Sequence, residues 1–204
     1  MTYYLPILSA LILVFSFLPL LNKIRKNRSA SGVSLLMLTF GLSQSLYFTA
    51  YNIYFERFLI TLPFIVTGAL STLILYYFTR YNAAKNERMQ LVIMLSLSLT
   101  PFLLLLLPQF EIGTLLNVLT YVGLVMSSVR VMPQTYKTLR SGNISNLSAR
   151  YFIFQCLAGV CGLTVELSLA IPSTSHVLMF VMLLLTNIVQ FACMQYYKMR
   201  PVMA

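Results

Sequence analysis

Charged residues are scarce in this 204-residue chain, at 9% of the sequence, and none of the four acidic residues is an aspartate. A soluble domain carries roughly 25% charged residues, so the composition excludes an ordinary soluble protein. The polar stretches are too short to hold a catalytic domain. They contain no nucleophile–base pair, no cluster of metal ligands and no glycine-rich phosphate loop. The sequence therefore predicts neither an enzyme nor a protein with a metal or another cofactor.

Cysteine and histidine are also few. Cys156, Cys161 and Cys193 all lie in apolar stretches, without the spacing of a metal site and without a pair of loops that a disulfide could join. We expect them to be small buried hydrophobic residues. His176 is the only histidine. A lone histidine is a weak indication of a metal site or a pH sensor.

Hydrophobic residues make up 59% of the chain and are gathered into long uninterrupted runs. A membrane-spanning helix needs about 20 mostly apolar residues. The runs do not alternate as barrel strands do, and backbone polar groups in lipid need partners within their own segment. The predicted spans are about 3–21, 33–54, 58–79, 89–107, 113–132, 147–171 and 176–197. The sequence thus predicts an all-α protein with seven transmembrane helices in a lipid bilayer.

The net charge of +10 comes from basic clusters between the apolar runs. This is the positive-inside pattern of membrane proteins, and it does not indicate a nucleic-acid partner. With alternating connections, 12 of the 14 basic residues fall on one side of the membrane. The 12 are Lys23, Arg25, Lys26, Arg28, Arg80, Lys85, Arg88, Lys137, Arg140, Arg150, Lys198 and Arg200. We therefore expect a cytoplasmic C-terminus and an N-terminus that is outside or lumenal. Short loops favour a prokaryotic cytoplasmic membrane, with an endolysosomal membrane as the alternative.

The chain carries a weak internal repeat. A shift of 114 residues aligns 19–40 with 133–154 without gaps, with five identities, and pairs Pro19 with Pro133 and Lys23 with Lys137. The aligned segments occupy matching topological positions, each at the end of one span and the start of the next. Internal repeats of this kind are common in transporters.

The repeat divides the predicted helices into three groups. Residues 1–82 form the first three-helix repeat, 83–112 a linker helix, and 113–204 the second three-helix repeat with a short tail. A single linker helix makes the two repeats parallel in the membrane, so the expected arrangement is 3+1+3.

Met132, Pro133 and Gln134 end a predicted helix on the basic side, and a Gly-Asn-Ile-Ser turn follows before the next helix. This segment resembles the PQ-loop motif. The first copy departs from it, because Leu20 follows Pro19. Over about residues 3–197 the chain is similar to the PQ-loop repeat family of cystinosin-like, SWEET-related seven-helix transporters.

The resemblance implies a solute carrier that works by alternating access. Pro19 and Pro133 would act as hinges, because proline removes an i→i−4 hydrogen bond and kinks a helix. Gln134 would cap freed carbonyl groups or line an inner gate. The alternative is that the two prolines simply end their helices.

Polar residues near the middle of the predicted spans are candidates for the solute site, because such groups usually face the bundle interior. They are Gln44, Tyr47, Tyr121, Gln155 and Asn187, with Gln190 closer to the cytoplasm. On one predicted helix Asn117, Tyr121 and Ser128 form a single stripe. The alternative role for each residue is an interhelical hydrogen bond. Asn187 matches the pocket asparagine of SWEETs on helix 7, but helix 3 has no counterpart, which does not favour a sugar-type pocket.

Two charged residues lie within predicted spans. Glu166 is in the outer third of its helix, where a carboxyl group in a low-dielectric site could carry a coupling proton. The alternative is an interfacial carboxylate with a polar partner. Arg130 is near the inner end of its helix, and we expect it to extend toward the interface.

The function that these observations favour is transport of a small polar metabolite, with an amino acid as the preferred solute. Proton coupling through Glu166 is a separate hypothesis. The main alternative is a seven-helix sorting receptor of the KDEL-receptor type. A rhodopsin-like receptor would share the seven helices but not the repeat.

Overall fold

The computed structural model describes residues 4–82 and 111–199, with a few residues between 89 and 99. Every long element in this part of the chain is an α-helix. The helices are α1 (Tyr4–Asn27), α2 (Leu35–Tyr54), α3 (Phe58–Asn82), α5 (Ile112–Val129), α6 (Met132–Ser141), α7 (Ala149–Leu167) and α8 (Thr174–Met199). The predicted span at about 89–107 lies mostly outside the described residues, so the count of seven remains a prediction.

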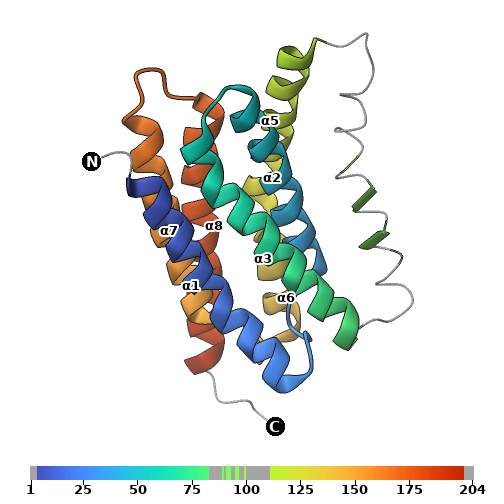
Figure 1. Cartoon of the computed structure of the whole chain (residues 1–204). Helices are drawn as coiled ribbons and strands as arrows, with labels where there is room; N and C mark the ends of the chain where they lie inside the picture. Colours follow the sequence, from blue (N-terminus) through green and yellow to red (C-terminus); the bar gives the residue numbers. More distant parts are fainter. Residues whose placement is uncertain are drawn as a thin grey trace.

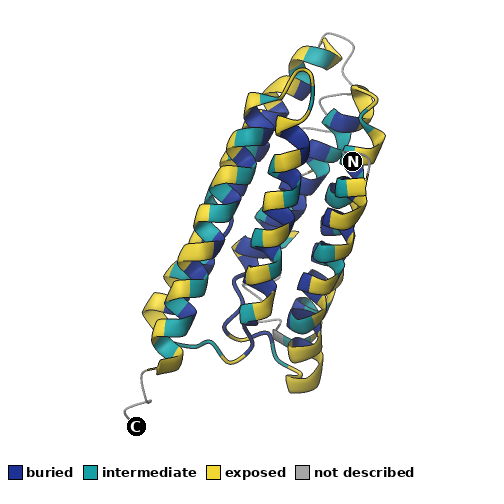
Figure 2. Cartoon of the chain, turned by 90° about the vertical axis from the view of Figure 1, so that its left-hand side faces the viewer, coloured by how far each residue is buried: buried dark blue, intermediate teal, exposed yellow. Residues whose placement is uncertain are grey.

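In the described ranges, five helical segments are long and apolar enough to cross a membrane: α1, α3, α5 together with α6, α7, and α8. The 20-residue α2 carries several polar side chains, among them Gln44 and Asn52, and these are buried in the bundle. Exposed residues line the outside of the helices and buried residues the inside (Figure 2). These features are those of a multi-pass integral membrane protein.

The helices form one bundle whose axes run side by side (Figure 1). Helix α3 packs against both α1 and α2, and α8 packs against both α5 and α7. The two groups meet where α1 contacts α7 and where α2 contacts α5. The described helices therefore surround a common centre.

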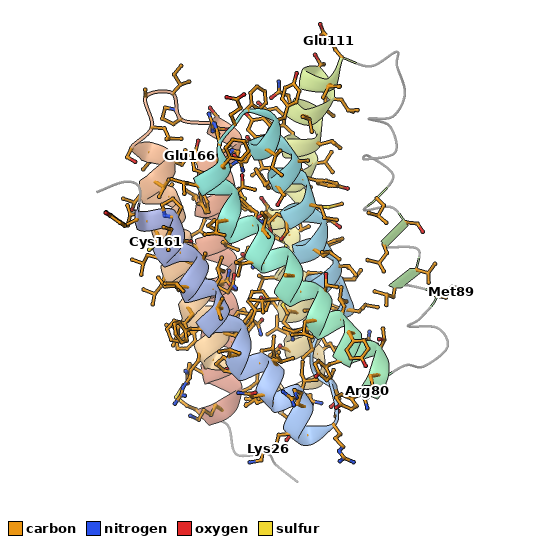
Figure 3. The ribbon with its side chains drawn as sticks, in the orientation of Figure 1. Lys26, Arg80, Met89, Glu111, Cys161 and Glu166 are labelled. Carbon is orange, nitrogen blue, oxygen red and sulfur yellow. The ribbon has the colours of Figure 1, made fainter. Side chains whose placement is uncertain are left out.

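The helix bounds follow the 114-residue shift. Asn27 ends α1 and Ser141 ends α6, while Leu35 begins α2 and Ala149 begins α7. Both turns open on a residue with positive φ, Arg28 at 45° and Gly142 at 62°. Both turns lie at the end of the bundle where Lys26 and Arg80 are found, opposite Glu111 and Glu166 (Figure 3). We call this the basic end.

The ends of the first and fifth predicted helices, near residues 21 and 132, differ from the structure. Helix α1 continues to Asn27 instead of ending near residue 21, because lysine and arginine are good helix formers once the chain has left the apolar region. Pro19 lies inside α1, so it does not end that helix. Pro133 lies in the first turn of α6, just after a break at residues 130–131. This is where a proline fits, because its missing N–H is not needed there.

Gly123 of α5 packs against the side chains of Phe48 and Tyr47 on α2. A Cβ atom at this position would lie 3.1 Å from Cε2 of Phe48, whose side chain is fully buried. The Phe48 ring is held by Phe64, with centroids 5.2 Å apart, and by His176, at 4.6 Å. We expect Gly123→Ala to cost about 1–3 kcal/mol by overpacking, seen as a lower unfolding temperature of the detergent-purified protein.

Gly68→Ala is the matched control. There the nearest atom to an added Cβ is Cβ of Ser45 at 3.4 Å, an ordinary contact, and alanine favours the helix. Equal unfolding temperatures for the two variants would show that Phe48 has room to move.

Candidate functional site

Arg130 lies at the centre of the bundle, where its side chain is only 3% exposed. Its Nη2 donates a hydrogen bond to Oε1 of Gln155 on α7 at 3.0 Å, and its Nη1 donates to Oε1 of Gln44 on α2 at 3.4 Å. Nε2 of Gln155 donates in turn to Oγ of Ser16 on α1 at 3.0 Å. These four residues, the Arg130 cluster, join α1, α2 and α7 to the end of α5.

The expectation that Arg130 extends to the interface is wrong. Arg130 is the residue that follows α5, at the break before Pro133. Gly41 of α2 leaves room for its side chain, since a Cβ there would lie 3.3 Å from Cδ of Arg130. The guanidinium turns inward because two amide oxygens accept its hydrogen bonds.

Two pairs of positions in and beside the cluster are related by the 114-residue shift. Arg130 corresponds to Ser16, and Gln155 corresponds to Gly41, which lies next to the cluster. In each pair one member has a long polar side chain and the other a small one. Gln155 contacts both Ser16 and Arg130, and Arg130 contacts Gly41.

A cavity of about 30 Å³ adjoins the cluster. Its lining includes the polar residues Ser9, Gln44, Thr67, Arg130 and Gln155 and the aromatic residues Phe64 and Phe180. This space holds about one water molecule.

Two further cavities lead from this centre to the end opposite the basic one. The next, of about 20 Å³, shares Ser9, Pro63, Phe64 and Phe180 with the central cavity. The last, of about 410 Å³, shares Pro6, Ile60 and Val165 with the second and also contacts Arg57 and Leu169. The polar centre therefore lies at one end of a row of three neighbouring cavities, and the outermost of the three has the largest volume.

At the basic end, the turns 28–34 and 142–148 are joined by reciprocal hydrogen bonds. Nζ of Lys23 donates to the carbonyl oxygen of Leu147 at 2.6 Å, and Nζ of Lys137 donates to that of Val33 at 2.7 Å. The donors are 114 residues apart, and so are the acceptors. We call the contacts that link these turns and the ends of α1 and α6 the loop junction.

The side chain of Gln134 is fully buried, and its two hydrogen bonds to the other turn are buried as well. Its Oε1 accepts from the backbone N–H of Ser34 at 2.7 Å, and its Nε2 donates to the carbonyl oxygen of Gly32 at 2.8 Å. Gln134 does not cap carbonyl groups freed by Pro133. It binds the backbone of the other turn.

Glu166 lies toward the opposite end of the bundle, on α7, and is fully buried. Its Oε1 accepts from the backbone N–H of Ser173 at 2.6 Å and forms an ion pair with Nη1 of Arg57 at 3.5 Å. Within the described parts of the chain, its Oε2 has no hydrogen-bond partner. His176, also fully buried, lies 3.4 Å from the Asn52 amide.

The other predicted site residues lie in different parts of the bundle. Gln44 and Gln155 belong to the Arg130 cluster, as described above. Asn187 and Gln190 are fully buried on α8, with Gln190 donating to Oγ1 of Thr138 at 3.1 Å. Tyr47 is buried against Gly123, between α2 and α5.

Tyr121 is a wrong prediction. Its side chain is 58% exposed on the outer face of α5, because the buried face of that helix is formed by Leu116, Thr120, Gly123 and Ser127. The stripe with Asn117 therefore faces outward too.

Arg130 is the central residue that the sequence analysis did not include in the site, because it was expected at the membrane interface. The available signal was a charged residue within a predicted span, which usually faces the bundle interior.

Comparison with known proteins gives a similarity of fold. No family model matches the chain, and no curated protein matches it. A solved structure of a eukaryotic SWEET transporter matches with a TM-score of 0.66 and 15% sequence identity, covering 98% of this chain and 99% of that chain. The helical bundle around the Arg130 cluster therefore has the fold of a SWEET transporter.

Proposed function

We propose that the chain is an alternating-access transporter of a small polar metabolite, with an amino acid as the preferred solute. The observation that carries this proposal is the unequal access to the Arg130 cluster. Cavities lead toward the cluster from one end of the bundle, whereas the loop junction joins the two halves at the basic end. This is the arrangement expected of a carrier closed on one side.

We further propose the 3+1+3 arrangement, with residues 1–82 and 113–204 as parallel repeats and 83–112 as the linker helix. The reciprocal bonds of Lys23 and Lys137 support it, as do helix ends that recur after 114 residues. Membership in the PQ-loop family rests on the Pro133-Gln134 segment.

The basic end would face the cytoplasm, by the positive-inside bias. The bilayer would be a prokaryotic cytoplasmic membrane, with an endolysosomal membrane as the alternative.

In this mechanism the break before Pro133 and the proline inside α1 are the hinges. Arg130 is three residues from Pro133 and four from Gln134, so a movement at the solute site would reach the loop junction through α6. Opening of the basic end requires the bonds of Gln134 and of the two lysines to break. Gln44, Gln155, Asn187 and Gln190 would bind the solute or carry the helix contacts that change.

Solute flux in proteoliposomes tests the proposal. We expect uptake of at least one compound from a panel of radiolabelled amino acids, glucose and lactate, above that of protein-free vesicles. An imposed proton gradient should stimulate uptake by the wild type but not by Glu166→Gln, if Glu166 carries the proton. Equal pH dependence in both proteins would remove Glu166 from the mechanism. The absence of flux for every compound would contradict the transporter function.

A further inference from the structure

Arg130 is a buried cation without an acidic partner in the part of the chain that the structure describes. Of the three acidic residues in that part, Glu56 and Glu111 are exposed. Glu166 is paired with Arg57 and lies eleven residues from Gln155 along α7, which corresponds to about 16 Å. The charge on Arg130 is therefore not neutralised by a described side chain.

The hydrogen bonds to Arg130 are also incomplete. A guanidinium has five N–H donors. Two of them bind the amide oxygens of Gln155 and Gln44, and Nε has no hydrogen-bond partner among the described residues. A buried charge without a partner is unfavourable, so a site of this kind is matched to an anion that completes it.

The neighbours of Arg130 hold it in one orientation. Nε2 of Gln155 is fixed by Ser16, whose hydroxyl donates to the carbonyl oxygen of Leu13 at 2.7 Å. Nε2 of Gln44 donates to Sδ of Met179 at 3.2 Å. Both amides thus present their oxygens to the guanidinium, and each has one N–H of its nitrogen engaged with another residue. A planar guanidinium in a fixed position suits a carboxylate, which it can bind through two parallel hydrogen bonds.

We propose that Arg130 binds the carboxylate group of the transported solute, and that the substrate class is therefore small carboxylate-bearing metabolites, amino acids among them. This inference rests on the proposed transport function and gives it a substrate class. The apolar neighbours Phe64, Phe180 and Leu183 line the same cavity and offer contacts to the rest of a small solute. A cavity of about 30 Å³ has to widen to admit it. Phe180, which lines both inner cavities, is only partly buried.

The experiment compares acids with their amides. Proteoliposomes are loaded with the best-transported amino acid, and uptake of that amino acid is measured. L-Alanine, L-leucine and L-glutamine are added as competitors, and the corresponding amino acid amides are added in parallel. The inhibition by each acid is compared with the inhibition by its amide. In the wild type each acid should compete better than its amide. In Arg130→Gln the apparent affinity for the acid should fall roughly 10- to 100-fold and the preference over the amide should disappear.

Two other variants test whether the effect depends on the charge of Arg130, on the planar shape of its guanidinium or on its position in the bundle. Arg130→Lys keeps the charge but loses the planar fork, so a smaller loss of affinity is expected. Arg140→Gln removes the same charge from an exposed position at the basic end and should leave the preference for the acid intact.

Gln155→Glu keeps the proposal testable if Arg130→Gln does not fold. A carboxylate at position 155 would lie against the guanidinium, since the present Oε1 is 3.0 Å from Nη2. This variant should be at least as thermostable as the wild type and yet lose the preference for the acid. The same preference in Gln155→Glu as in the wild type would overturn the carboxylate site.

The failures can be told apart. Wild-type protein that transports glucose, with no inhibition by any acid, would overturn the carboxylate site but leave the transporter function in place. Wild-type protein without flux of any compound would overturn the transporter function itself.

Discussion

Gln134→Leu should lower the unfolding temperature of the purified protein more than any other single substitution in the loop junction. Leucine is similar in size but leaves the N–H of Ser34 and the carbonyl of Gly32 without a partner, and both residues are buried. Each orphaned buried group costs about 1–3 kcal/mol. The sum corresponds to a decrease on the order of 10 °C for a chain of this length.

Gln195→Leu is the control for this substitution. Gln195 is half-buried on α8 near the same end. We expect its unfolding temperature to stay within about 2 °C of the wild type, as for most partly exposed substitutions. If Gln134→Leu unfolded as late as Gln195→Leu, the two turns would be held together by their other hydrogen bonds, those of the two lysines and of Asn146.

The position of the helices could be predicted largely from the sequence, because a span in lipid must be a long apolar helix. The helix ends were predicted less accurately. The apolar run ends where the bilayer ends, but α1 continues to Asn27 and α6 is a further helix with Pro133 in its first turn. Both extensions are rich in polar and charged residues, so they carry little hydrophobic signal.

The inward faces could be predicted only in part. On α5 the polar stripe of Asn117 and Tyr121 and the true inward face of Thr120, Gly123 and Ser127 have the same helical period. In a soluble protein the polar face would be the outer one. In lipid the outer face gains nothing from being polar, and the inner face is often marked by small residues instead. The polar stripe was therefore the weaker guide, and the small residues identify the helix contact.

The Arg130 cluster could not be assembled from the sequence for a related reason. Its members are up to 139 residues apart, and the bond between Ser16 and Gln155 crosses from one half of the chain to the other. The repeat gave the position of each residue within its half. It did not show that positions 16, 44, 130 and 155 meet, because that depends on how closely the two halves approach.

Arg57→Met should destabilise the protein by about 2 kcal/mol. The substitution leaves the fully buried carboxylate of Glu166 with the N–H of Ser173 as its one remaining partner in the described chain. Removing one member of a buried ion pair costs about 3–5 kcal/mol, because the other charge is left uncompensated. We expect about 2 kcal/mol here, below that range, since Arg57 is 24% exposed and solvent screens part of the interaction.

A double-mutant cycle separates this effect from lost packing. Glu166→Gln keeps an acceptor for Ser173 and removes the charge, so it should cost less than Arg57→Met. The double variant with Arg57→Met and Glu166→Gln should be more stable than Arg57→Met alone, because no uncompensated charge remains. Arg150→Met, at an exposed arginine, serves as the control. A double variant as unstable as Arg57→Met would mean that the loss comes from the apolar stem of Arg57, and that the ion pair does not hold α3 to α7.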